Sequence, residues 1–126
     1  MNSKKILVID DETDIIRLLS FRLAKEGFNV MTAQDGKTGL TMARTERPHL
    51  IVLDLTLPEL PGEEVCKAVR EDDDEALATT PIIMVTAKMS DVDRIIGKSI
   101  GANHYITKPF DVEDLLKKIN VLIRQV

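Results

Sequence analysis

Short apolar runs of four or five residues alternate along the chain with longer segments in which apolar residues recur every three to four positions. The short runs have the length and β-branched content of strands. Three of them are nearly all apolar, as strands buried on both faces of a parallel sheet are. The predicted strands cover residues 6–9, 29–33, 50–54, 82–86 and 104–107. This pattern is typical of an α/β domain.

The segments between the strands have the period of amphipathic helices. Ile15, Leu19 and Leu23 share one face of the first, and Gly27 provides its stop. Strict alternation of five strands and five helices requires right-handed crossovers, and so predicts a parallel sheet with helices on both faces. The other predicted helices contain residues 35–46, 65–69, 92–96 and 115–123, with Asp35 and Asp111 as N-caps.

Acidic, hydroxyl and ammonium side chains stand where the predicted strands finish. Asp10 and Asp11 follow the first strand, Asp54 ends the third, Thr86 ends the fourth and Lys108 follows the fifth. Because the carboxyl ends of parallel strands meet at one edge, where ligands bind at a topological switch point, we expect these groups to converge. Three converging acids would repel by about 4 kcal/mol per close pair at an effective dielectric near 20, which favours a binding role over a structural one.

The converging groups suit a magnesium site at which a phosphoryl group is transferred. Mg²⁺ prefers oxygen ligands and is usually held by one or two carboxylates with phosphate oxygens. Asp54 stands alone on a central strand and is the candidate nucleophile for an aspartyl phosphate. Lys108 supplies positive charge and Thr86 a hydroxyl donor to phosphoryl oxygens. A cis bond between Lys108 and Pro109 would turn the chain and aim the lysine inward.

The motifs around these residues resemble the receiver domain of bacterial two-component response regulators, the chemotaxis-regulator-like superfamily. The resemblance covers the whole chain, and implies a single receiver domain over residues 1–126. It implies a flavodoxin-like α/β fold, a doubly wound five-stranded parallel sheet of order 2-1-3-4-5 with five helices in three layers. The matching motifs are Val8-Ile9-Asp10-Asp11-Glu12, Asp54-Leu55-Thr56-Leu57-Pro58, Val85-Thr86-Ala87 and Gly101-Ala102-Asn103-His104-Tyr105-Ile106-Thr107-Lys108-Pro109-Phe110.

The resemblance also assigns the chemistry. It implies that Asp54 accepts a phosphoryl group from a phosphohistidine of a sensor histidine kinase or a histidine phosphotransfer protein. Asp10 and Asp11 would bind Mg²⁺, with Mn²⁺ as a substitute, together with Asp54 and the main-chain carbonyl of Thr56. Lys108 would contact the phosphoryl group. The chain would catalyse only its own phosphorylation and dephosphorylation, and so would be a signalling switch instead of an enzyme.

The resemblance further implies how the switch is read. Thr86 would turn toward the phosphoryl group and free space into which Tyr105 rotates, so that a change of charge biases a bistable packing. The output surface would be the fourth helix, fifth strand and fifth helix, at about residues 91–124. It would bind a downstream protein or domain, or form a phosphorylation-dependent dimer. Pro61 stands where the family commonly has an acid, which predicts a stiffer loop after Asp54.

Composition and charge bear on the partners and the compartment of the protein. The formal net charge is −4 with no basic run or aromatic ladder, so we expect no direct nucleic-acid contact by this domain. No apolar stretch is long enough to span a bilayer, so we expect no membrane partner. The lone Cys66 fits a reduced, cytoplasmic protein and a place in the core.

Two other functions remain open from the residues. An aspartyl-nucleophile phosphohydrolase of haloacid dehalogenase type wants a second aspartate two residues after the nucleophile, where Thr56 stands, and a chain with room for a substrate cap. A flavodoxin-like cofactor binder would need aromatics to stack on the flavin. Its phosphate would also be repelled by an acidic pocket.

Some residues have simpler structural explanations. Asp11 alone would be the N-cap of the first helix, and Tyr105 alone an ordinary half-buried aromatic. His49 and His104 have no ligand spacing and are expected to be surface or satisfied side chains. The acidic run at residues 71–75 is expected to be solvated surface at the end of the third helix.

Overall fold

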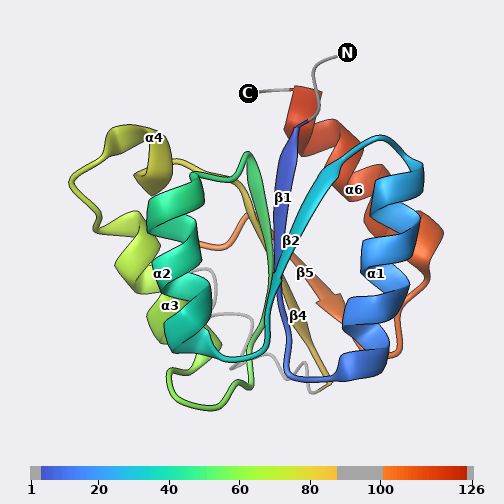
Figure 1. Cartoon of the computed structure of the whole chain (residues 1–126), viewed down its shortest axis with the longest axis horizontal. Helices are drawn as coiled ribbons and strands as arrows, with labels where there is room; N and C mark the ends of the chain where they lie inside the picture. Colours follow the sequence, from blue (N-terminus) through green and yellow to red (C-terminus); the bar gives the residue numbers. More distant parts are fainter. Residues whose placement is uncertain (1–3, 88–100, 125–126) are drawn as a thin grey trace.

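The computed structural model describes residues 4–87 and 101–124 as one parallel sheet between two layers of helices (Figure 1). The strands pair in the order β2-β1-β3-β4-β5, and every neighbouring pair is parallel. The predicted strands, strand order and three-layer fold are therefore confirmed. The strands are β1 Lys5–Ile9, β2 Asn29–Ala33, β3 Leu50–Asp54, β4 Ile82–Thr86 and β5 His104–Thr107.

The helices lie on both faces of the sheet. Figure 1 shows α2, α3 and α4 on one face and α1 and α6 on the other. The predicted helix at residues 92–96 lies outside the described residues. Within those residues, no helix is long and apolar enough to cross a bilayer. The helices are α1 Thr13–Lys25, α2 Gly36–Glu46, α3 Gly62–Arg70, α4 Glu75–Ala78 and α6 Val112–Arg124.

Two hydrophobic clusters, one on each face of the sheet, make up the core. Side chains alternate along β1, so that Ile6 and Val8 face α1 and α6 while Leu7 and Ile9 face α2 and α3. Both faces are buried, which explains why the central strands are apolar throughout. Cys66 is fully buried in the α3 cluster, as expected for a core thiol.

Capping side chains fix where two of the predicted helices begin. The Asp35 carboxylate accepts a hydrogen bond of 2.7 Å from the backbone N–H of Thr38, and the Asp111 carboxylate accepts one of 2.9 Å from that of Glu113. Both predicted N-caps are thus confirmed, and each satisfies a donor that the first helical turn leaves unpaired. His49 is satisfied as expected, because its Nδ1 accepts a bond of 2.9 Å from the backbone N–H of Lys5.

The prediction of solvated surface is wrong for part of the acidic run at residues 71–75. Asp74 caps the short helix α4 by accepting from the backbone N–H of Ala76 at 3.1 Å, and it also pairs with Arg47. Asp72 accepts from Arg44 at 3.3 Å. The side chains of Asp72 and Asp74 are only 19% and 26% exposed, because two arginines from α2 and the residue after it cover them.

Candidate functional site

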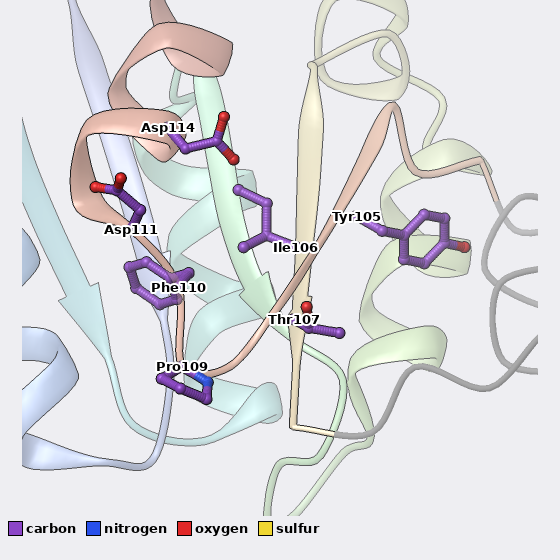
Figure 2. A pocket seen from close by; sticks show the side chains of 7 residues that line it. All are labelled: Tyr105, Ile106, Thr107, Pro109, Phe110, Asp111 and Asp114. Carbon is purple, nitrogen blue, oxygen red and sulfur yellow. The ribbon is translucent and has the colours of Figure 1, made fainter.

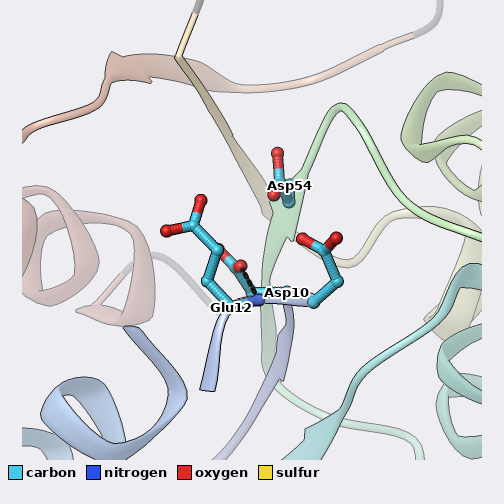
Figure 3. A group of neighbouring side chains, drawn as sticks. Asp10, Glu12 and Asp54 are labelled. Carbon is cyan, nitrogen blue, oxygen red and sulfur yellow. Dashed lines mark hydrogen bonds between the residues drawn. The ribbon is translucent and has the colours of Figure 1, made fainter. Parts of the chain in front are cut away.

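Four carboxylates gather at the carboxyl ends of β1 and β3. Asp10, Asp11 and Glu12 follow β1 and Asp54 ends β3, with ligand oxygens that all lie within 4.8 Å of one another. Figure 3 shows Asp10, Glu12 and Asp54 directed toward this shared space from the two neighbouring strands. Asp10 and Asp54 are buried, at 3% and 5% exposure, whereas Asp11 and Glu12 are exposed. The structure thus brings the predicted acids together.

Strand register explains why the two buried acids meet. Ile9 lies opposite Leu53, so the next residues, Asp10 and Asp54, leave neighbouring strands side by side. The Oδ1 atom of each accepts a hydrogen bond from the backbone N–H two residues later in the chain. Asp10 accepts from the backbone N–H of Glu12 at 2.8 Å, and Asp54 from that of Thr56 at 3.1 Å. These bonds leave both Oδ2 atoms for the centre of the site.

Glu12, and not Asp11, occupies the N-cap position of α1. Its side chain makes no capping hydrogen bond there. The simple structural explanation of Asp11 as the N-cap is therefore wrong, because α1 begins one residue later than that explanation requires. Asp11 is left exposed beside the buried pair, where it lines the cleft over the site.

Lys108 enters this acidic cluster from the end of β5. Its Nζ lies 3.0 Å from Oδ2 of Asp10, 3.0 Å from Oδ2 of Asp54 and 2.9 Å from Oε1 of Glu12. The Lys108–Pro109 bond is cis, as the sequence suggested. One ammonium thus neutralises part of the charge of three carboxylates.

Burial and hydrogen bonding shift the pKa values of Asp54 and Lys108 in opposite directions. Burial raises the pKa of Asp54, and the charge of Asp10 adds to the rise, while hydrogen bonds from Lys108 and Thr56 oppose it. Burial also disfavours the charged ammonium of Lys108. Hydrogen bonds to Glu12, Asp10 and Asp54 outweigh that effect and raise the pKa of Lys108. The lysine therefore stays charged at neutral pH.

An open cleft of about 260 Å³ lies over the acids, lined by Asp11, Glu12, Asp54, Thr56, Ala87 and Lys108. Its volume is below the roughly 300 to 1,000 Å³ typical of pockets for drug-sized ligands. The cleft is large enough for a phosphoryl group and a hydrated ion. Within the described residues it holds no aromatic side chain on which a flavin would stack.

Thr86 and Tyr105 lie near the site but in different surroundings. Thr86 ends β4, is buried, and lies opposite Thr107 of β5. Tyr105 is half-buried against the α3 side of the core. Figure 2 shows its ring on the opposite side of β5 from Ile106. The position of Tyr105 fits an ordinary half-buried aromatic. The switching roles of Thr86 and Tyr105 stay predictions.

The sequence from residue 6 to residue 120 matches the family model described as the response regulator receiver domain. The chain belongs to this family. Over 98% of its length, this receiver domain is 43% identical to the alkaline phosphatase synthesis transcriptional regulatory protein PhoP of Bacillus subtilis. It is 40% identical, over 96% of its length, to the response regulator ArlR of Staphylococcus aureus.

The chain spans about half the length of these curated relatives, 50% of the PhoP sequence and 53% of the ArlR sequence. Its fold is also that of solved receiver domains. The chemotaxis protein CheY4 of Vibrio cholerae superposes with a TM-score of 0.88 at 35% identity, covering 96% of this chain and 99% of the CheY4 chain. These matches support the receiver fold and lend no support to a haloacid dehalogenase.

Sequence reasoning missed Glu12 as a member of this receiver's site. Its carboxylate touches the ammonium of Lys108, 96 positions away in the chain. The only signal was its place directly after Asp10 and Asp11. That signal is weak, since a glutamate just before a helix is common.

The donor set of the receiver site fits a hard divalent cation. Every candidate ligand atom of the cluster is a carboxylate oxygen, with neither thiolate nor imidazole among them, and this suits Mg²⁺ or Mn²⁺. Two of the acids, Asp10 and Asp54, are buried with a lysine as their counter-ion. A cation at this place would share that neutralising role.

Proposed function

We propose that this receiver domain is a phosphorylation-dependent switch whose acceptor is Asp54. The observation that carries the proposal is the ammonium of Lys108 at 3.0 Å from Oδ2 of the buried Asp54, beside an open acidic cleft. Oδ2 would attack the phosphorus of a phosphohistidine on a sensor histidine kinase or a histidine phosphotransfer protein. The new O–P bond forms as the P–N bond breaks, and the histidine nitrogen leaves with the bonding electron pair.

The neighbours of Asp54 supply charge and orientation. The ammonium of Lys108 places a positive charge beside the acceptor, which favours the ionised carboxylate of Asp54. Once the acyl phosphate has formed, the same ammonium can donate a hydrogen bond to a phosphoryl oxygen. Asp10, Asp11, Asp54 and the main-chain carbonyl of Thr56 would hold Mg²⁺, or Mn²⁺ in its place. Such an ion would neutralise charge on the phosphoryl oxygens. Thr56 lines the same cleft, which supports this assignment.

The signal would leave the site through β5. Thr86 and Tyr105 are proposed to change packing when Asp54 carries a phosphoryl group, altering the surface at about residues 91–124, of which 101–124 are described. A downstream protein or domain, or a second phosphorylated copy, would bind there. The name of the Bacillus subtilis relative, a transcriptional regulatory protein, supports a transcriptional output. We propose no direct contact of this domain with nucleic acid or membrane.

We also propose that residues 1–126 act as a single cytoplasmic receiver domain. It would catalyse only its own phosphorylation and dephosphorylation. The hydrolase alternative lacks its second aspartate, because Thr56 stands two residues after Asp54. The backbone N–H of Thr56 is tied to Asp54 at 3.1 Å, so this residue stabilises the loop. Thr56 therefore does not provide the general acid that repeated hydrolysis of an external substrate needs.

Intact-mass measurement after incubation with a small phosphodonor and Mg²⁺ tests the proposal. We expect one phosphoryl adduct on the unchanged protein, none on Asp54→Asn, and none after chelation of the metal. Asp73→Asn, an exposed acid outside the cluster, is the matched control and should be phosphorylated like the unchanged protein. An adduct that survives Asp54→Asn would overturn the assignment.

A further inference from the structure

Arg70, the last residue of α3, donates hydrogen bonds to two separate segments of the chain. Its Nη1 donates to the carbonyl of Ala78, the last residue of α4, at 3.1 Å and to that of Thr80, between α4 and β4, at 2.7 Å. Its Nε donates to the carbonyl of Gly101 at 2.9 Å and its Nη2 to Oδ1 of Asn103 at 3.0 Å, just before β5. One guanidinium thus joins α3 to the entries of two strands.

Asn103 extends this link into the sheet. Its Oδ1 also accepts from the backbone N–H of Ile82 at 2.8 Å, and its own N–H donates to the carbonyl of Ile82 at 2.8 Å. Among the described strands, β5 lies at the edge of the sheet and pairs with β4 alone. The entry of this edge strand is therefore held by both Ile82 and Arg70 through Asn103.

The local backbone is shaped around the guanidinium. Gly101 has φ of +97°, a conformation that favours glycine, and a Cβ there would lie 2.9 Å from Nε of Arg70. Arg70 is half-buried, so water replaces its hydrogen bonds poorly, and the same burial lowers its pKa. A lysine carries the same charge but lacks the rigid fork that reaches several acceptors at once.

The same face of α3 lies beside Tyr105. Tyr105 packs against the hydrophobic cluster that contains Cys66 and Val69 of α3. Figure 2 shows the Tyr105 ring directed toward the α3 side. Burial raises the pKa of Tyr105, and the Cys66 thiol, one helical turn before Arg70, adds to that rise. The helix that ends at Arg70 therefore contributes to the surroundings of the Tyr105 ring.

We propose that Arg70 is a positioning residue that ties the entry of β5 to α3 and thereby fixes the packing of Tyr105. It touches none of the acids at the opposite end of the strand. The inference rests on the proposed function only in treating β5 as the element that transmits the signal. The tie itself is a property of the unphosphorylated protein, so it can be tested without phosphorylation.

The chain contains one tyrosine and no tryptophan, so its tyrosine fluorescence reports on Tyr105 alone. Acrylamide quenching at pH 7 is measured on Arg70→Lys, Arg70→Met and the unchanged protein. Arg44→Met is the matched control, since Arg44 is 51% exposed and bonds a single carboxylate. We expect the quenching constant to rise about twofold in both Arg70 variants, as local opening exposes the half-buried ring, and to stay unchanged in the control.

Circular dichroism of each sample separates folding from positioning. If Arg70→Met does not fold, Arg70→Lys keeps the test, because lysine retains the charge and lacks only the rigid fork of the guanidinium. Folded variants of lower stability with an unchanged quenching constant would overturn the proposal and leave Arg70 a purely structural residue. Absence of a phosphoryl adduct on the unchanged protein would instead refute the proposed function, and the quenching comparison would stand.

Discussion

The ammonium of Lys108 lies 3.0 Å from Oδ2 of Asp54, although 54 positions separate the two residues in the chain. The same ammonium also reaches Asp10 and Glu12. Lys108 therefore partly offsets the repulsion expected among the converging acids. A cation bound at this site would therefore add its positive charge to that of Lys108, which already neutralises part of the negative charge of the acids.

The first prediction follows from removing that lysine. Lys108→Met leaves Asp10 and Asp54 buried without their counter-ion, and losing one partner of a buried pair costs about 3 to 5 kcal/mol. We expect the free energy of unfolding in metal-free buffer, measured by urea denaturation at pH 7, to fall by about 3 kcal/mol. Lys118→Met removes an exposed pair with Asp114 and should cost under about 0.5 kcal/mol. Equal losses in the two variants would contradict the prediction.

A second prediction concerns pH and Asp54. Burial raises its pKa, and a carboxyl whose pKa rises on folding stabilises the protein below its unfolded pKa and loses that contribution as pH rises through the folded value. Ionised Asp54 therefore costs stability at pH 7. Asp54→Asn should melt above the unchanged protein at pH 7 without metal, with a gain that shrinks as the pH falls toward 4.

Calorimetry from pH 4 to pH 7 checks this dependence. Asp73→Asn is the control, since Asp73 is exposed and lies outside the cluster. Its melting temperature should follow that of the unchanged protein at every pH. If Asp54→Asn melts lower at pH 7, the pairing with Lys108 outweighs the cost of burying Asp54.

The third prediction separates metal binding from stability at Asp11. Asp11 is exposed and forms no ion pair within residues 4–87 and 101–124. Asp11→Asn should therefore change the free energy of unfolding by under about 0.5 kcal/mol in metal-free buffer. It should weaken Mg²⁺ binding by about tenfold in calorimetric titration, or roughly 1.4 kcal/mol. Asp14→Asn, in the first turn of α1, should leave Mg²⁺ affinity unchanged. Unaltered Mg²⁺ affinity in Asp11→Asn would remove this acid from the metal site.

Much of the fold was predictable because the apolar runs report burial on both faces of the sheet. β2 to β5 lie where the runs placed them, and β1 begins one residue earlier, at Lys5. The convergence of Asp10 and Asp54 also followed, because parallel strands bring their carboxyl ends together. Local pattern and overall fold agree in these parts of the chain.

The rest depends on contacts that leave no periodic trace. Helix α4 has four residues, too few to show a helical repeat, and its capping Asp74 stood in a charge run. The bond of Glu12 to Lys108 spans 96 positions. Arg70 binds three backbone carbonyls and one amide, and carbonyls are present at every position of a sequence. Such contacts become visible only when the chain is folded.

The last prediction concerns the loop after Asp54, which docks on the start of α2. The backbone N–H of Gly36 donates to the carbonyl of Pro58 at 3.1 Å, and a Cβ at Gly36 would lie 1.8 Å from the carbonyl oxygen of Leu60. Gly36→Ala would favour the helix slightly if only propensity mattered, since alanine is the better helix former. Because the clash is with backbone, we expect instead a loss of about 2 kcal/mol and displacement of the loop.

Displacement of this loop should also reach the metal site, because the loop carries Thr56, whose carbonyl is a proposed Mg²⁺ ligand. Gly36→Ala should therefore lower both the free energy of unfolding and the affinity for Mg²⁺, measured by urea denaturation and calorimetric titration. Lys37→Ala, at the exposed neighbouring position, should change neither by much. A Gly36→Ala protein as stable as the unchanged one would show that the loop can leave α2 at little cost. If the Mg²⁺ affinity also held, Thr56 would be independent of this docking.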